Sequence, residues 1–138
     1  MTEESGFRIL DEDAVLTPVE ADRYLKQVNN ELGRAQIALR RLRYEELRLT
    51  KAYTEAKTVL LFSVDCPKVG RSEGQVTVDE RDAWINAHID CYWQFASLQV
   101  QVKNAEDYLR TVGKQVSIAQ TLNNNAKDAY NSYQGGGR

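Results

Sequence analysis

The sequence predicts an all-α protein: a long antiparallel, coiled-coil-like hairpin of two helices that self-associates into a helical oligomer. Two stretches of the 138-residue chain carry apolar residues at steps that alternate between three and four. This spacing places the side chains on one stripe of a helix, where they seek a partner helix. The segment between the stretches contains Pro67, Gly70 and Gly74, which interrupt helix formation and allow the chain to reverse.

The first helix is expected over residues 18–62. Thr17 offers a capping hydroxyl, Pro18 suits the first helical position, and Glu20 completes a capping box. Glu46 is the one polar member of the stripe, and we expect it either to fix the register by pairing with His88 or an arginine, or to mark a local opening. The stripe consists of Leu25, Val28, Leu32, Ala35, Leu39, Leu42, Glu46, Leu49, Tyr53, Ala56 and Leu60.

A connector over residues 63–77 is expected to lead into a second helix over residues 78–130. Thr77 and Glu80 form a second capping box at its start. Residues 133–138 are expected to be a flexible tail. The stripe of the second helix consists of Trp84, His88, Cys91, Phe95, Leu98, Val102, Ala105, Leu109, Val112, Val116 and Ala119.

A further set of apolar residues lies beside the second stripe, around residues 84–96. One partner helix cannot cover apolar surface on most sides of a helix, so either a short third segment or another subunit must pack there. Because two helices alone leave much apolar surface exposed, we expect a homo-oligomer. The predicted oligomer interface consists of Trp84, Ile85, Ile89, Tyr92, Trp93 and Ala96.

Charge divides the chain unevenly, although the formal net charge is only −2. Residues 1–22 contain seven acidic residues and one basic residue, residues 23–81 contain twelve basic and eight acidic residues, and residues 82–138 contain five of each. Residues 1–16 are therefore expected to form an acidic N-terminal arm, followed by one hairpin domain over residues 17–132.

The residue types argue against an enzyme. His88 is the one histidine and belongs to the core stripe, and Cys66 and Cys91 have no nearby base placed by the sequence. Neither a disulfide framework nor a metal site is indicated, and no cofactor or small-molecule substrate is expected. No apolar run is long enough to cross a membrane and the N-terminus is acidic, so we expect a cytoplasmic protein with no membrane partner.

Basic residues of the first helix are the best functional lead. Arg34, Arg41 and Arg48 recur every seven residues, and Tyr44 is an aromatic side chain off the core stripe. Guanidinium groups on a rigid helix suit a phosphate backbone, and aromatic rings suit unpaired bases. The alternative is that these arginines pair with acidic residues. The predicted nucleic-acid-binding residues are Arg34, Arg40, Arg41, Arg43, Arg48, Lys51, Lys68 and Arg71.

The order of these features resembles bacteriophage UvsY-like recombination mediators and the short helical proteins that accompany phage single-strand annealing proteins. The resemblance rests on residues 42–57, on the connector that ends in Thr77-Val-Asp-Glu-Arg81, and on residues 91–110 and 116–123. It implies a non-enzymatic homo-oligomer in the host cytoplasm that binds single-stranded DNA and assists DNA recombination. The implied protein partners are a recombinase or a single-strand-binding protein.

Two other interpretations remain. In the first, the chain is a phage protein-interaction or structural module, either an inhibitor of a host factor or a virion assembly component, which uses its acidic arm and its apolar helix face. In the second, it is a coiled-coil oligomeriser whose arginines are used in ion pairs.

Overall fold

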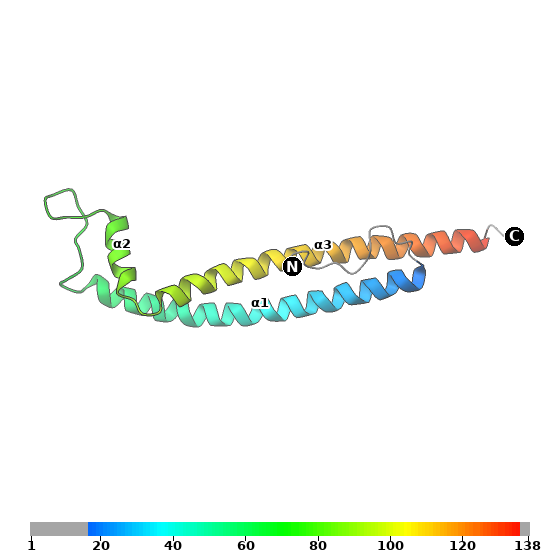
Figure 1. Ribbon diagram of the computed structural model, residues 1–138, viewed down its shortest axis with the longest axis horizontal. Coiled ribbons are helices and arrows are strands. Elements are labelled where there is room, and N and C mark those ends of the chain that lie inside the picture. Colours follow the sequence, from blue (N-terminus) through cyan, green and yellow to red (C-terminus); the bar gives the residue numbers. More distant parts are fainter. Residues whose placement is uncertain (1–16, 136–138) are drawn as a thin grey trace, which may run out of the picture. The chain divides into compact units, whose positions relative to one another are not determined.

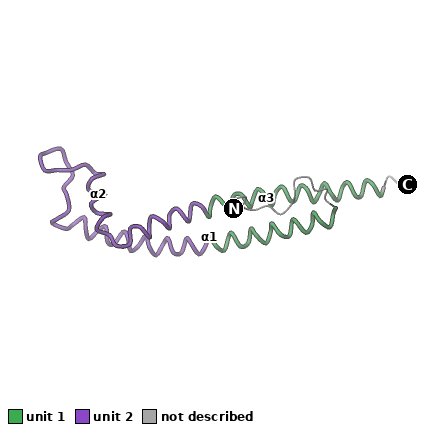
Figure 2. The backbone as a smooth tube through the Cα atoms, in the orientation of Figure 1, with its two compact units in different colours: residues 1–39, 105–138 green, residues 40–104 purple. Residues whose placement is uncertain are grey.

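The computed structural model describes residues 17–135 of the chain, and within them it contains three α-helices: α1 (Pro18–Leu61), α2 (Val78–Ala87) and α3 (Tyr92–Gly135) (Figure 1). The predicted acidic arm, residues 1–16, and the last three residues of the predicted tail lie outside the described residues. The described residues fall into two compact units, one of residues 17–39 and 105–135, and one of residues 40–104 (Figure 2).

Helix α1 begins where the predicted capping box places it. The Glu20 backbone N–H donates to the Thr17 hydroxyl at 3.2 Å, and the Thr17 N–H donates to a Glu20 carboxylate oxygen at 3.4 Å. These bonds satisfy donors that a helix start leaves unpaired. At the start of α2 the Glu80 N–H donates to the Thr77 hydroxyl at 3.1 Å, so both predicted helix starts are confirmed.

The first unit is an antiparallel pair of helix segments. The Tyr24 hydroxyl donates to Gln115 at 3.0 Å and the Tyr108 hydroxyl donates to Glu31 at 3.0 Å, so residue numbers rise along α1 as they fall along α3. Antiparallel packing of α1 and α3, predicted from the two stripes, is confirmed. The core of this unit consists of Tyr24, Val28, Val116 and Ala119, against which Leu25, Leu32 and Leu122 pack.

The second unit adds α2 to the same pair of helices. Tyr53 of α1 stacks on Phe95 of α3, with ring centroids 4.5 Å apart and planes 13° apart. Its buried apolar residues are Ile85, Ile89, Leu98 and Val102. Of the side chains in both predicted stripes, His88 alone is exposed; the others are buried or half-buried, so the heptad pattern identified the packed surfaces.

The continuous second helix expected over residues 78–130 is wrong, because the chain leaves the helix between α2 and α3. His88 ends α2 with φ −102° and ψ 3°, and its N–H donates to the Ile85 and Asn86 carbonyls. The break allows Ile85 and Ile89 to be buried within the chain. The apolar set near residue 84 is therefore buried in part by division of the predicted second helix into α2 and α3, and not by a separate third segment.

The connector between α1 and α2 is an ordered loop. The Val76 N–H donates to the Lys68 carbonyl at 2.9 Å and the Gly70 N–H donates to the Val76 carbonyl at 3.1 Å. Gly74 has φ +83°, a conformation that side-chain-bearing residues avoid, and a Cβ at Gly70 would lie 1.8 Å from the Gln75 side chain. The Gln75 side chain is flexible and can move away from such a Cβ, so Gly74 is the glycine that the loop's backbone geometry requires.

The C-terminal boundary also differs from the prediction. Residues 133–135, expected in a flexible tail, belong to α3, which ends at Gly135. Consecutive asparagines at 123–125 do not end the helix, and Asn123 is buried.

Candidate nucleic-acid interface

The predicted basic residues of α1 that belong to the second unit are all exposed. Tyr44 and Leu47 lie among them and are 69% and 68% exposed. Residues three, four and seven positions apart share one side of a helix, so these side chains form a single surface away from the packed stripe. We call this surface the basic face, and it consists of Arg40, Arg41, Tyr44, Leu47, Arg48 and Lys51.

Ion pairing differs along the basic face. Arg48 donates through Nη2 to both carboxylate oxygens of Glu45, at 2.8 and 3.2 Å, and this hydrogen bond, with the charge of Glu45, raises the pKa of Arg48. Arg43, beside the face, also makes an interaction within the chain. Among the described residues, Arg40, Arg41 and Lys51 have no ion-pair partner. The prediction that the arginines are used up in ion pairs therefore holds for some arginines and not for Arg40 and Arg41.

Arg34 belongs to the first unit and has a different environment. Its Nε donates to Glu31 Oε1 at 3.1 Å, while the other oxygen of Glu31 accepts from the Tyr108 hydroxyl at 3.0 Å. Burial, followed by this hydrogen bond and the charge of Glu31, raises the pKa of Tyr108. The Arg34 side chain is 68% exposed, but its guanidinium is held by a carboxylate that also links α1 to α3.

Lys68 and Arg71 lie on the connector loop of the second unit, and both side chains are exposed. The loop is held by the Ser72 N–H, which donates to Gln75 Oε1 at 2.9 Å, and by the bonds between residues 68–70 and Val76. Two cations on an ordered loop add to the positive surface of this unit.

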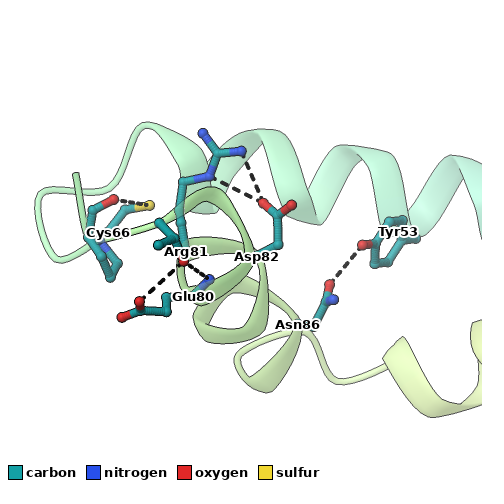
Figure 3. Close-up of polar contacts among 8 residues, drawn as sticks. Tyr53, Cys66, Glu80, Arg81, Asp82 and Asn86 are labelled. Carbon is teal, nitrogen blue, oxygen red and sulfur yellow. Dashed lines mark hydrogen bonds and ion pairs between the residues drawn. The ribbon is translucent and has the colours of Figure 1, made fainter. Parts of the chain in front are cut away.

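A hydrogen bond holds α2 against α1 (Figure 3). The Tyr53 hydroxyl donates to Asn86 Oδ1 at 2.7 Å, and burial raises the pKa of Tyr53. Tyr92 lies 6.2 Å from Tyr53 and 5.1 Å from Trp93 between ring centroids, so aromatic rings extend from α1 to the start of α3. In the same region Arg81 donates to Asp82 through Nε and Nη2, at 3.2 and 3.0 Å.

The predicted oligomer interface is corrected at two positions. Ile85 and Ile89 are 0% and 6% exposed within a single chain, because α2 packs on the helix pair, so they are not available to a second subunit. Trp84, Tyr92 and Ala96 are half-buried, whereas Trp93 is 77% exposed. Trp93 is thus the one residue of the predicted set that presents a large apolar surface.

An open groove of about 470 Å³ lies between α2 and the first turn of α3. The sequence contains its signal, the spacing of Asp79, Asp82, Ala83 and Asn86 at i, i+3, i+4 and i+7, which places them on one side of a helix. We did not predict the groove because a continuous second helix has no second wall. We call it the α2–α3 groove, and its lining includes Asp79, Asp82, Ala83, Asn86, Tyr92 and Trp93.

His88, Glu46 and Cys66, which the sequence singled out, belong neither to the basic face nor to the α2–α3 groove. His88 Nδ1 lies 2.7 Å from the Trp84 carbonyl oxygen, and its ring packs 4.2 Å from the Trp84 ring. No hydrogen bond or ion pair joins Glu46 to His88 or to an arginine within the described chain, so the predicted register contact is wrong. Cys66 is half-buried at an open pocket of about 420 Å³, with its Sγ 3.6 Å from the Pro67 carbonyl oxygen.

Between residues 17 and 135 no group of three or more His, Cys, Asp and Glu side chains is arranged to hold a metal ion. No helix in this range combines the length and the apolar character needed to cross a membrane.

Compared with known protein families, with curated proteins and with solved structures, the chain matches none. The resemblance to phage recombination mediators, drawn from the order of features in the sequence, stays a prediction.

Proposed function

We propose that this protein binds single-stranded DNA through the basic face, without a catalytic role, as a recombination mediator that helps a recombinase onto DNA. The observation that carries the proposal is the position of Tyr44. Its ring is 69% exposed on the same side of α1 as Arg40, Arg41 and Arg48, one turn away in each direction. Cations in a row with an exposed aromatic ring among them are what single-strand binders combine.

The basic face suits unpaired strands better than a duplex. Arginine and lysine neutralise phosphates of either form without reading sequence, but a ring can stack only on a base that is free of its partner. Arg40, Arg41 and Lys51 have no ion-pair partner among residues 17–135, so phosphates need not displace a carboxylate from them. Arg34 and Arg48 must exchange an existing carboxylate contact, and we expect them to contribute less.

The first test replaces three cations and measures DNA binding. The variant Arg40→Ala, Arg41→Ala, Lys51→Ala should bind a labelled single-stranded oligonucleotide at least tenfold more weakly than the parent, measured by fluorescence polarisation at low salt. The matched control is Lys103→Ala, Lys114→Ala, Lys127→Ala, which makes the same change in net charge on exposed positions of α3. Equal binding by the two variants would contradict the proposal.

A second test addresses stacking. Tyr44→Ala should lose about 1–3 kcal/mol of binding free energy, the usual range for one aromatic ring on a base, whereas Tyr44→Phe should retain most of it. The same polarisation measurement compares both variants with the parent. If the alanine and phenylalanine variants bind alike, Tyr44 does not stack on a base.

Self-association and a protein partner complete the proposal. The exposed Trp93 supports self-association, because large exposed aromatic side chains are typical of interaction surfaces. Light scattering with and without a single-stranded oligonucleotide counts the subunits in each state. The proposed partners, a recombinase or a single-strand-binding protein, follow from the resemblance alone.

The acidic arm supports the alternative function, a protein-interaction or virion assembly module. Residues 1–16 carry five acidic residues and one basic residue, an unsuitable composition for a strand of phosphates. Deletion of residues 1–16 should leave DNA binding unchanged or stronger if the basic face is the working surface. If the deletion abolishes binding of a protein partner and leaves DNA binding unaffected, the arm is the working surface.

A further inference from the structure

The α2–α3 groove exposes acidic and apolar side chains that have too few partners within their own unit. Its lining residues include two carboxylates, those of Asp79 and Asp82, and no basic residue. Asp82 is already paired with Arg81, whereas Asp79 has no ion-pair partner among the described residues. The opposite wall carries Trp93, which is 77% exposed and in edge contact with Tyr92. Such a groove suits a helix that presents both cations and apolar side chains.

The wall of the groove that α2 forms is held in place by contacts with the rest of the unit. Asn86 is the last of the α2 residues that line the groove. It accepts a hydrogen bond of 2.7 Å from the Tyr53 hydroxyl of α1, a contact drawn in Figure 3. Ile85, the residue before Asn86 in α2, is fully buried. A wall anchored in this way is formed before any partner arrives, so binding does not have to order it.

One surface of this chain has the complementary character. The basic face combines the unpaired cations Arg40 and Lys51 with Tyr44 and Leu47, two exposed side chains on the same side of α1. Both surfaces expose apolar groups, and their charges are opposite. Contact between the groove and the basic face would therefore bury apolar surface and pair opposite charges. A second copy of the chain is the partner that carries both surfaces.

We propose that the α2–α3 groove receives the basic face of a second copy of this chain, with Tyr44 and Leu47 against Trp93 and an arginine or lysine beside Asp79. The proposal rests in part on the proposed function, because the same basic face is assigned to single-stranded DNA. It follows that a second copy and a DNA strand compete for the basic face. Binding of DNA then removes the basic face of one copy from the groove of another. The self-associated form is therefore the form of the protein without DNA.

The contact is tested by charge reversal with rescue. Asp79→Lys, Ala83→Lys makes the groove basic, and Arg40→Glu, Lys51→Glu makes the face acidic; these positions are exposed, or line the groove, and none belongs to the core. In sedimentation velocity each variant alone should self-associate at least tenfold more weakly than the parent. An equimolar mixture should recover association, because the basic groove then meets the acidic face and the acidic groove meets the basic face.

The matched control is Lys103→Glu, Lys114→Glu, which reverses two exposed charges on α3 that belong to neither surface and should leave association as in the parent. Recovery in the mixture also shows that both variants are folded. If the single variants associate like the parent, or if the mixture stays as weak as its components, the proposal is wrong.

The competition is tested separately with a single-stranded oligonucleotide as the probe. In a Trp84→Phe background Trp93 is the one remaining tryptophan, and its emission should shift to longer wavelength as the oligonucleotide releases the groove. The groove variant Asp79→Lys, Ala83→Lys retains the basic face and should bind the oligonucleotide at least as tightly as the parent. If the oligonucleotide binds and the assembly stays intact, the shared use of the face is wrong while DNA binding stands. If the charge-reversal mixture recovers but no oligonucleotide binds, the proposed function fails and the contact between copies stands.

Discussion

At the scale of single residues, Tyr53 makes two contacts that hold the second unit together. Its ring stacks on Phe95, and its hydroxyl donates to Asn86 of α2 at 2.7 Å. The heptad pattern predicted that Tyr53 lies on the packed side of α1, and this is confirmed. Its hydrogen bond could not be predicted, because Asn86 becomes a neighbour only when α2 separates from α3.

Removal of the Tyr53 hydroxyl should weaken the attachment of α2. Tyr53→Phe keeps the ring and loses one hydrogen bond, which should lower the free energy of unfolding by about 1 kcal/mol. Urea denaturation followed by circular dichroism measures the change. Tyr133→Phe, at a position that is 85% exposed, is the control and should change stability by less than about 0.5 kcal/mol. Equal effects at the two positions would show that the contact with Asn86 adds nothing.

Three tyrosines predict how stability depends on alkaline pH. Burial is the largest cause that raises the pKa of Tyr24, Tyr53 and Tyr108 above the usual value of about 10. The unfolded chain therefore releases these protons at lower pH than the folded chain does, so the tyrosines favour folding fully below about pH 10 and lose this contribution as the pH rises through the folded-state values. Urea denaturation at pH 8, 9, 10 and 11 should show a constant tyrosine contribution at first and a decline at the top of the range. Stability that rises between pH 10 and 11 would be the wrong sign.

At the scale of elements, the starts of α1 and α2 and the packing of α1 on α3 follow from local chemistry. Two capping boxes fix the helix starts, and two heptad stripes fix which sides meet. The break between α2 and α3 has no such signal: residues 88–91 include neither glycine nor proline, and the heptad steps continue through them. Burial of Ile85 and Ile89 decides the break, and that depends on three-dimensional packing rather than on local sequence.

Glycines in the helix and in the loop should respond to alanine in opposite directions. A Cβ at Gly33, inside α1, would meet nothing within 4 Å, so Gly33→Ala should stabilise the protein by about 0.5–1 kcal/mol through helix propensity. Gly74→Ala should destabilise it by about 1–2 kcal/mol, because φ is +83° there. Thermal or urea denaturation of the two variants measures both signs. A loss of stability in Gly33→Ala would mean that this position needs glycine for a reason other than space.

At the scale of the whole molecule, the sequence places charge and apolar surface in separate segments. The acidic residues of the first 22 positions, the basic residues of α1 and the acidic start of α2 are all evident in the printed chain. The predicted DNA-binding set could be chosen from this pattern, but the distinction between Arg34, held by Glu31, and Arg40, with no such partner among residues 17–135, required side-chain positions. The α2–α3 groove could not be predicted at all, since it depends on the helix break.

The salt dependence of DNA binding tests the central claim most directly. Each phosphate neutralised on a single strand contributes about −0.7 to the slope of log affinity against log salt, so four cations of the basic face predict a slope of about −3. With Arg40, Arg41 and Lys51 replaced by alanine, Arg48 is the one cation of the basic face that remains, and the contribution of the face to the slope should fall to about −0.7. Polarisation of a labelled single-stranded oligonucleotide across a salt series measures both slopes. A parent protein that shows no binding at low salt, or a variant whose slope equals that of the parent, would contradict the account.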